Sequence, residues 1–225
     1  MQEGKIMKRR WLAAALTIVM TVVLGFGLTA CGGSAEEQLA FEGEWVSAGI
    51  LKAGLPEGWI NDEDRQKADD EAGEYELLFT SNDNNDSSTV MVFINARRTP
   101  RIGEDTGYKT LREVAMAGLA KSDREDAEFT TQELGGLTFA RVDMVEHISK
   151  KNEIRLFYKS GTAEKQNGDF DREYTTCTIR VVGPYLEDQE TVESIIDSVR
   201  LNLGDEYTDE VKNALKAEPG APEEE

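Results

Sequence analysis

The side chains best suited to covalent chemistry in this sequence are two cysteines and its only histidine. A histidine that takes the proton from a thiol activates it as a nucleophile, so Cys177 and His147 form a candidate catalytic dyad. Neighbouring strands could bring these residues together, but nothing in their spacing requires it. Cys177 stands among threonines and Ile179, a context typical of a small residue in a strand. We therefore predict that no dyad forms and that the protein is not an enzyme.

Two oxygen-rich segments could bind a divalent cation. Asp62 and Asp64 lie in the first segment, and Asp83 and Asp86 lie in the second. Neither segment has the order of aspartates, glycine and distal glutamate that forms an EF-hand loop. Aspartate and asparagine also favour tight turns, because their side chains hydrogen-bond to the nearby backbone. These four aspartates are the calcium candidates of the sequence, but the pattern favours turns, and we predict no bound metal ion and no cofactor.

Cys31, the other cysteine, follows the only long apolar segment of the chain. The basic residues 8–10 lead into the apolar and small residues 11–30. This order is typical of a secretory signal peptide, which is removed from the mature protein. The alternative is an uncleaved transmembrane helix, because twenty apolar residues would just span a bilayer. Gly25 and Gly27 favour the signal peptide, because they loosen the helix where a peptidase needs an extended backbone.

The sequence Leu28-Thr29-Ala30-Cys31 resembles the lipobox of bacterial lipoproteins. The resemblance implies cleavage between Ala30 and Cys31 and attachment of a diacylglycerol to the Cys31 sulfur. Two acyl chains, at about 0.8 kcal/mol per buried methylene, form a stable anchor. The resemblance to the lipobox therefore implies a lipid-anchored protein on the cell membrane that faces outside the cytoplasm. Cys177 would then be the only free thiol, so we expect no intramolecular disulfide.

The net charge of the mature protein limits the classes of partner that it can bind. Residues 1–30 contain four basic residues and one acidic residue, so their removal lowers the formal charge from -19 to -22. Binding to nucleic acid independently of sequence needs a basic surface, and we predict no nucleic-acid partner. The acidic surface should also hold the domain away from anionic lipid head groups. The charge favours solubility, with attraction of a cationic partner or divalent ions as the alternative.

Apolar alternation and short apolar runs predict a series of strands. Residues 41–59 predict a first strand that a Pro-Glu-Gly turn closes, and the polar residues 61–73 predict a loop. The Gly135-Gly136 pair suits the positive φ angles of a tight hairpin turn. Further strands are expected at residues 75–79, 90–94, 129–134, 137–145, 153–159 and 174–182.

Two helices are expected among these strands. Thr110 and Glu113 have the spacing of a capping box, which predicts a helix over residues 110–121. Asp188 is expected to cap a closing helix. Its apolar residues recur at helical spacing and form one stripe: Val192, Ile195, Ile196 and Val199. A short helix could form at residues 211–215.

Hairpins with one helix inserted midway and one at the end predict an α+β fold, an antiparallel sheet with helices packed on it. The Leu-Pro-Glu-Gly-Trp sequence at residues 55–59, the capped helix, the Gly-Gly turn and the closing Ile-Ile-Asp-Ser-Val helix together resemble the PsbP-like fold, an α/β/α sandwich. The predicted parts are a spacer at residues 31–40, a single domain at 41–203 and an acidic, disordered tail at 204–225.

The PsbP-like family includes extrinsic photosystem subunits, a small nuclear import factor that binds a GTPase, and many bacterial lipoproteins. Its characterised members bind proteins and are not enzymes. We therefore expect a membrane-tethered, extracytoplasmic lipoprotein that acts as a non-catalytic binding module for another envelope protein, which needs an exposed apolar or charged patch. The alternatives are a carrier for a small apolar or lipidic ligand, which needs an enclosed pocket, and a calcium-binding surface domain.

Overall fold

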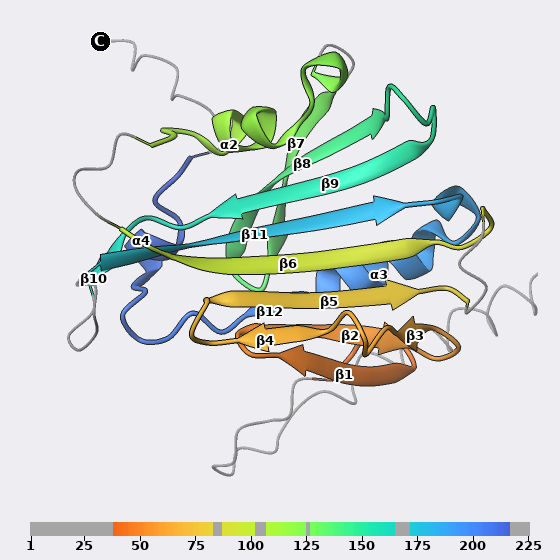
Figure 1. Ribbon diagram of the computed structural model, residues 1–225, viewed down its shortest axis with the longest axis horizontal. Helices are drawn as coiled ribbons and strands as arrows, with labels where there is room; N and C mark the ends of the chain where they lie inside the picture. The colour runs from red at the N-terminus through yellow and green to blue at the C-terminus, as the bar shows by residue number, and fades with distance from the viewer. Residues whose placement is uncertain (1–37, 83–86, 102–106, 125–126, 165–171, 217–225) are drawn as a thin grey trace, which may run out of the picture. The chain divides into compact units, whose positions relative to one another are not determined.

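An antiparallel sheet of long strands is the largest element of the protein (Figure 1). The computed structural model describes residues 38–82, 87–101, 107–124, 127–164 and 172–216. In spatial order, the strands of this large sheet are β3 (Ile60–Asn61), β5 (Glu74–Thr80), β6 (Met91–Pro100), β11 (Arg172–Val182), β9 (Asn152–Lys159), β8 (Leu137–Val145) and β7 (Glu128–Leu134). Two short strands pair with its members, β4 (Lys67–Asp69) with β5 and β10 (Ala163–Glu164) with β11. With its few helices, the described part of the chain confirms the predicted α+β class.

The hairpins of the large sheet follow the predictions. β5 pairs with β6, and β7 pairs with β8 through the Gly135-Gly136 turn. These two glycines have φ angles of 57° and 80°, a region that residues with a Cβ rarely adopt. The strands predicted at residues 153–159 and 174–182 are β9 and β11. Because β11 pairs with both β6 and β9, it joins the two halves of the chain in one sheet.

A smaller sheet contacts β5 and consists of β1 (Gly43–Ala48), β2 (Leu51–Pro56) and β12 (Arg200–Leu201). The prediction of a single strand over residues 41–59 is wrong, because the chain reverses near Gly49 and forms a β1–β2 hairpin. Gly49 has a φ of 58°, and a Cβ there would lie 2.2 Å from the ring of Tyr75. The predicted Pro-Glu-Gly turn follows β2, where the Trp59 N–H donates to the Pro56 carbonyl at 3.1 Å.

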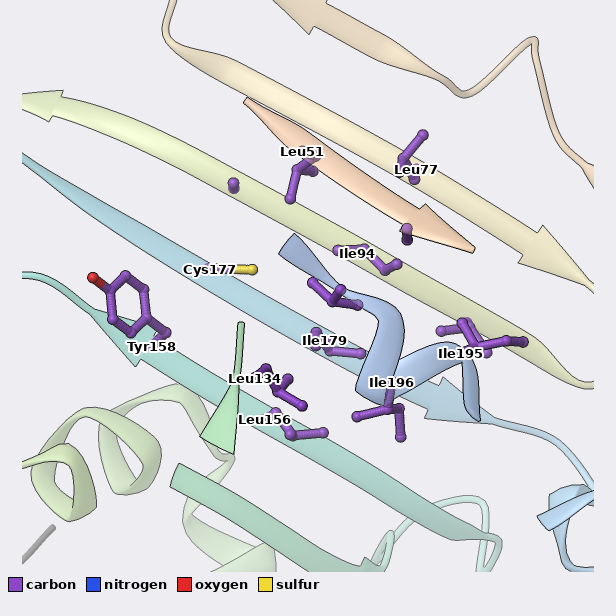
Figure 2. Close-up of a cluster of buried hydrophobic side chains, with 14 of the residues drawn as sticks. Leu51, Leu77, Ile94, Leu134, Leu156, Tyr158, Cys177, Ile179, Ile195 and Ile196 are labelled. Atoms are coloured by element: carbon purple, nitrogen blue, oxygen red, sulfur yellow. The ribbon is translucent and has the colours of Figure 1, made fainter. Parts of the chain in front are cut away.

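The main core lies on one face of the large sheet, where the smaller sheet and α3 (Gln189–Ser198) cover it. Side chains alternate between the two faces of a strand, so every second residue of β5, β6, β9 and β11 points into this core. The predicted apolar stripe of α3 is buried there. Figure 2 shows side chains from both layers meeting, among them Leu51, Leu77, Ile94, Leu156, Ile179, Ile195 and Ile196. We call this side of the large sheet the inner face.

The other, outer face of the large sheet carries α2 (Leu111–Gly118), which packs on β8 and β9. Its capping box is confirmed, since Thr110 Oγ1 accepts from the Glu113 N–H at 3.2 Å and the Glu113 carboxylate accepts from the Thr110 N–H at 3.3 Å. The helix ends at Gly118, earlier than predicted, because Leu119 is extended. Under it lies a second, smaller core of Leu111, Ala115, Leu119, Ala140, Val142, Met144 and Phe157.

Two local predictions differ from the structure. Residues 61–73 are not only a loop, because β4 forms within them and pairs with β5. β4 is a polar strand outside the main path of the sheet, so it lacks the apolar alternation that would mark it in the sequence. Asp188 occupies the N-cap position of α3, as predicted, but its side chain makes no capping hydrogen bond.

The fold continues beyond Leu203, where the sequence predicts the end of the domain. Tyr207 is only 1% exposed and packs in the main core. α4 (Asp209–Lys212) follows it, and the Leu111 N–H donates to the Lys216 carbonyl at 2.9 Å. The boundary at Leu203 is therefore too early. Residues 1–37 and 217–225 lie outside the described residues, and the predictions made for them stay predictions.

Candidate functional site

The part of the outer face formed by β5, β6 and β11 is the strongest candidate for a functional surface. α2 packs on β8 and β9, and in Figure 1 the long strands β6 and β11 lie in front of α3. Alternate residues of β6 and β11 face outward here, and the pairing of Phe93 with Arg180 places these two side by side. We define the open face by its largest side chains, which are half-buried or exposed: Met91, Phe93, Arg97, Tyr174 and Arg180.

Arg180, one of the two arginines of the open face, shares a buried carboxylate with a second arginine. The Arg180 guanidinium donates to Glu153 at 2.7 Å, and Arg155 donates to the same carboxylate at 2.8 Å. Glu153 is only 3% exposed, whereas the Arg180 side chain is 44% exposed. The pair of guanidiniums outnumbers the single carboxylate, so this cluster presents a positive charge to solvent.

The opposite end of the open face is a network of exposed ions. The Arg97 side chain is 63% exposed and lies 3.7 Å from the Glu74 carboxylate. Lys67 on β4 also pairs with Glu74, and its hydrogen bond lowers the pKa of Glu74 and raises its own pKa. Nearby, the Lys159 ammonium lies 4.7 Å from the centre of the Tyr174 ring. Because Arg97 is exposed and Lys67 and Glu74 are partly exposed, their ion pairs contribute little to stability and remain accessible to a partner. Lys159, in contrast, is only 7% exposed.

A cavity of about 540 Å³ lies beside the open face at the edge of the large sheet. Residues 60–65 form one side, and Leu78, Thr80, Asn82 and Met91 form the rest. The cavity is open to solvent. It does not match the enclosed pocket between sheet and helices that a lipid carrier needs.

The calcium candidates are only partly described. Asp62 and Asp64 line the cavity, and Asp62 lies 3.7 Å from the Arg65 guanidinium. Among the residues with described positions, no three His, Cys, Asp or Glu side chains are grouped so that they could hold a metal ion. Asp83 and Asp86 lie outside the described residues.

The structure does not bring Cys177 and His147 together. Cys177 points into the main core, is 1% exposed, and burial raises the pKa of its thiol well above the ordinary value (Figure 2). His147 lies in the exposed turn after β8, where its backbone N–H donates to Asp123 at 3.0 Å. Cys177 pairs with Tyr158, six residues along β9 from Asn152 at the turn, a distance of about 20 Å. The candidate dyad is therefore not formed.

A buried polar cluster at Tyr207 has no counterpart in the predictions. The Tyr207 hydroxyl accepts from Thr175 Oγ1 at 2.9 Å and donates to Glu173 at 3.2 Å. Arg98 lies 4.0 Å from Glu173 and donates to the Leu203 carbonyl at 3.1 Å. Burial raises the pKa of Tyr207. The cluster ties the segment after Leu203 to the large sheet, so its role is structural.

The open face could have been predicted from one signal in the sequence. Met91, Phe93, Asn95 and Arg97 occupy every second position of a strand whose alternate residues are apolar. Such an alternation places a mixed set of side chains on the face opposite the core. What it does not indicate is whether a helix covers that face.

Comparison with known proteins adds no family to this description. No protein-family model matches the chain, and no curated protein is significantly similar to it in sequence. In the described part of the chain, no helix is long and apolar enough to cross a membrane.

Proposed function

We propose that this protein is a lipid-anchored, extracytoplasmic binding module that engages another envelope protein through its open face and catalyses no reaction. The Leu28-Thr29-Ala30-Cys31 sequence supports the anchor, with Cys31 as the lipidated residue. A diacyl anchor fixes the module at the membrane without a spanning helix.

The residue types on the open face support the proposed binding to another protein. Phenylalanine, tyrosine, methionine and arginine are enriched in protein interfaces relative to other surfaces. All four occur together here, in Phe93, Tyr174, Met91, Arg97 and Arg180. Rigid paired strands hold them, so a partner can bind without ordering this surface first.

We also propose that the fold is a PsbP-like α/β/α sandwich. The order of the hairpins, the capped helix midway and the closing helix support this assignment. So do α2 and α3, which lie on opposite faces of the large sheet. If the assignment is right, binding to proteins is the function that the family favours.

Photo-crosslinking in the native membrane tests the open face. A benzoylphenylalanine at the exposed Asn95 should give one discrete adduct with a partner, and the same probe at the exposed Glu133 on β7 should not. Arg97→Glu should remove the adduct by reversing a charge on the surface while the protein stays folded. Equal adducts from both positions, or an adduct that survives Arg97→Glu, would contradict binding at this face.

The anchor has its own test. Cys31→Ala, or treatment with the signal-peptidase inhibitor globomycin, should leave a larger precursor; Cys31→Ala should also abolish incorporation of radiolabelled palmitate. Mature size and detergent partitioning that do not change would show that Cys31 is not lipidated.

A further inference from the structure

Exposed apolar side chains gather at one end of the large sheet. Among the described residues, large apolar side chains are exposed at five positions: Ile60, Tyr108, Val145, Ile148 and Leu186. β5, β8 and β11 run in the same direction, because single antiparallel strands separate them. Ile60 pairs with the end of β5, Val145 ends β8, and Ile148 lies in the turn that follows. Leu186 lies just after β11, on the short 3₁₀ helix η2 (Tyr185–Glu187). These four residues define the apolar end, on the right in Figure 1.

Ile148 is the most exposed of them, at 86%, and its turn is held by hydrogen bonds. The Glu146 N–H donates to the Lys151 carbonyl at 2.9 Å, and the Lys150 N–H donates to the Glu146 carbonyl at 2.8 Å. The Glu146 carboxylate accepts from the Ile148 N–H at 3.1 Å and from the Ser149 N–H. The turn therefore presents an isoleucine to water in a fixed conformation, and burial of that side chain would be favourable.

Two lysines give this turn its exposed charge. Lys150 and Lys151 are exposed, and their ammonium groups form no ion pair with a described residue. The carboxylate of the turn, Glu146, is occupied by backbone N–H groups. An apolar side chain next to lysines is typical of segments that lie on a membrane, because the ammonium groups stay among the lipid head groups while the apolar group enters the acyl boundary.

The other exposed residues of the apolar end have acidic neighbours. Leu186 is followed by the exposed Glu187 and Asp188, and Ile60 is followed by the carboxylates of residues 62–64. An anionic membrane repels these positions, whereas it attracts lysines. The turn after β8 is therefore the part of the apolar end that suits a membrane surface.

The chain enters the folded domain at the apolar end. Gly43, at the start of β1, pairs with Pro56 at the end of β2, and Ile60 follows four residues later. Between Cys31 and Leu39, where the domain begins, the chain can span at most about 29 Å. A lipid on Cys31 would therefore keep this end of the sheet close to the bilayer.

We propose that the turn after β8 docks on the bilayer that holds the lipid anchor, with Ile148 at the acyl boundary and Lys150 and Lys151 among anionic head groups. The docking rests on the anchor of the proposed function, because one apolar side chain buries too little surface to hold a protein on a membrane. With the anchor in place, the contact forms at a high effective concentration. The long strands then run away from the bilayer, which leaves the open face along them accessible to an envelope protein.

Paramagnetic relaxation in nanodiscs tests the docking with the mature, lipidated protein. The bilayer contains phosphatidylcholine, phosphatidylglycerol and a lipid with a spin label near its head group. The label should broaden the amide signals of residues 145–151 and leave Gly135 and Gly136 unchanged, because β8 separates the two turns by about 30 Å. Equal broadening at both turns, or none at residues 145–151 in protein that co-elutes with the nanodiscs, would overturn the docking and leave the anchor intact. Protein that does not co-elute would contradict the anchor and the docking with it.

Variants with matched controls identify the groups that dock. Ile148→Ser should lower the ratio of docked to undocked protein at least about fivefold, whereas Tyr108→Ser, outside the apolar end, should leave it unchanged. Lys150→Gln with Lys151→Gln should lower the ratio at least about threefold with phosphatidylglycerol and have little effect in phosphatidylcholine alone. Equal effects of the two serine variants, or of the lysine pair in the two membranes, would contradict the proposal.

Discussion

The two faces of the large sheet differ in what covers them. On β11, Ile179 and Cys177 point to the inner face and are at most 1% exposed, whereas the Arg180 side chain on the outer face is 44% exposed. Among the described residues, the smaller sheet and α3 cover the inner face, and α2 packs on the outer face at β8 and β9. One alternating strand therefore contributes to stability with half of its side chains and to the surface with the other half. Substitutions on the inner face should therefore affect stability, and substitutions on the open part of the outer face should affect the surface.

Truncation in the main core should have the largest effect on stability. Ile196 of α3 is 0% exposed, and Ile196→Ala should lower the free energy of unfolding by about 2 to 5 kcal/mol, because it leaves a cavity. Asn95→Ala on the open face should change it by less than about 0.5 kcal/mol. Urea denaturation measures both. Similar losses from the two variants would show that the open face is part of a packed interface within the protein.

Glu153 should be the exception on the outer face. It is buried and accepts hydrogen bonds from Arg155 and Arg180, so Glu153→Gln leaves two guanidiniums without their shared counter-charge. We expect a loss of about 2 kcal/mol in the free energy of unfolding. The matched control is Asp143→Asn, because Asp143 is an exposed partner of Arg141 and should cost less than about 1 kcal/mol. A smaller loss for Glu153→Gln than for this control would contradict the role of burial.

The capping box should contribute less than the buried groups. Thr110→Ala removes the acceptor for the Glu113 N–H and should cost about 1 kcal/mol, whereas Thr110→Ser keeps a hydroxyl and should stay close to the native stability. Hydrogen exchange of the α2 amides measures the local effect. Unchanged exchange in Thr110→Ala would show that packing against β8 and β9 alone holds the start of the helix.

The smallest effect is expected from an exposed carboxylate in the turn after β8. Hydrogen bonds from the Ser149 and Ile148 backbone lower the pKa of Glu146 from 4.5 to about 2. Because the pKa is lower in the folded state, Glu146 stabilises the turn above pH 4.5, and this contribution is lost as the pH falls toward 2. Titration of the Glu146 side chain by nuclear magnetic resonance should show a midpoint well below 4.5. A midpoint near 4.5 would mean that these hydrogen bonds do not persist in solution.

Features that depend on residues close together in the chain were predictable. The spacing of Thr110 and Glu113 predicted the capping box, and the Gly135-Gly136 pair predicted the hairpin turn. The stripe on α3 was predicted from its 3.6-residue period. The β1–β2 turn at Gly49 was missed, because the close approach of Tyr75 to that glycine involves a distant strand.

Contacts between distant parts of the chain explain what the sequence could not indicate about the candidate site. Asp62 and Asp64 were recognised as oxygen-rich, but the cavity also needs Leu78 and Met91, which reach it only when β5 and β6 pair. The burial of Tyr207 likewise depends on Thr175 and Glu173 of β11. No local pattern around Tyr207 marks it as a core residue.

The sequence by itself determined the α+β class, the β5–β6 and β7–β8 hairpins, the helices α2 and α3, and the acidic charge, because these follow from composition and from periods of two and 3.6 residues. It also provides the whole basis for the proposed anchor at Cys31. Only the tertiary structure decided which face of the large sheet stays open, where a cavity forms and that the fold extends past Leu203. The physical reason is that a sheet face is covered when segments far apart in the sequence pack against it. No single stretch of the chain shows which distant segments will do so.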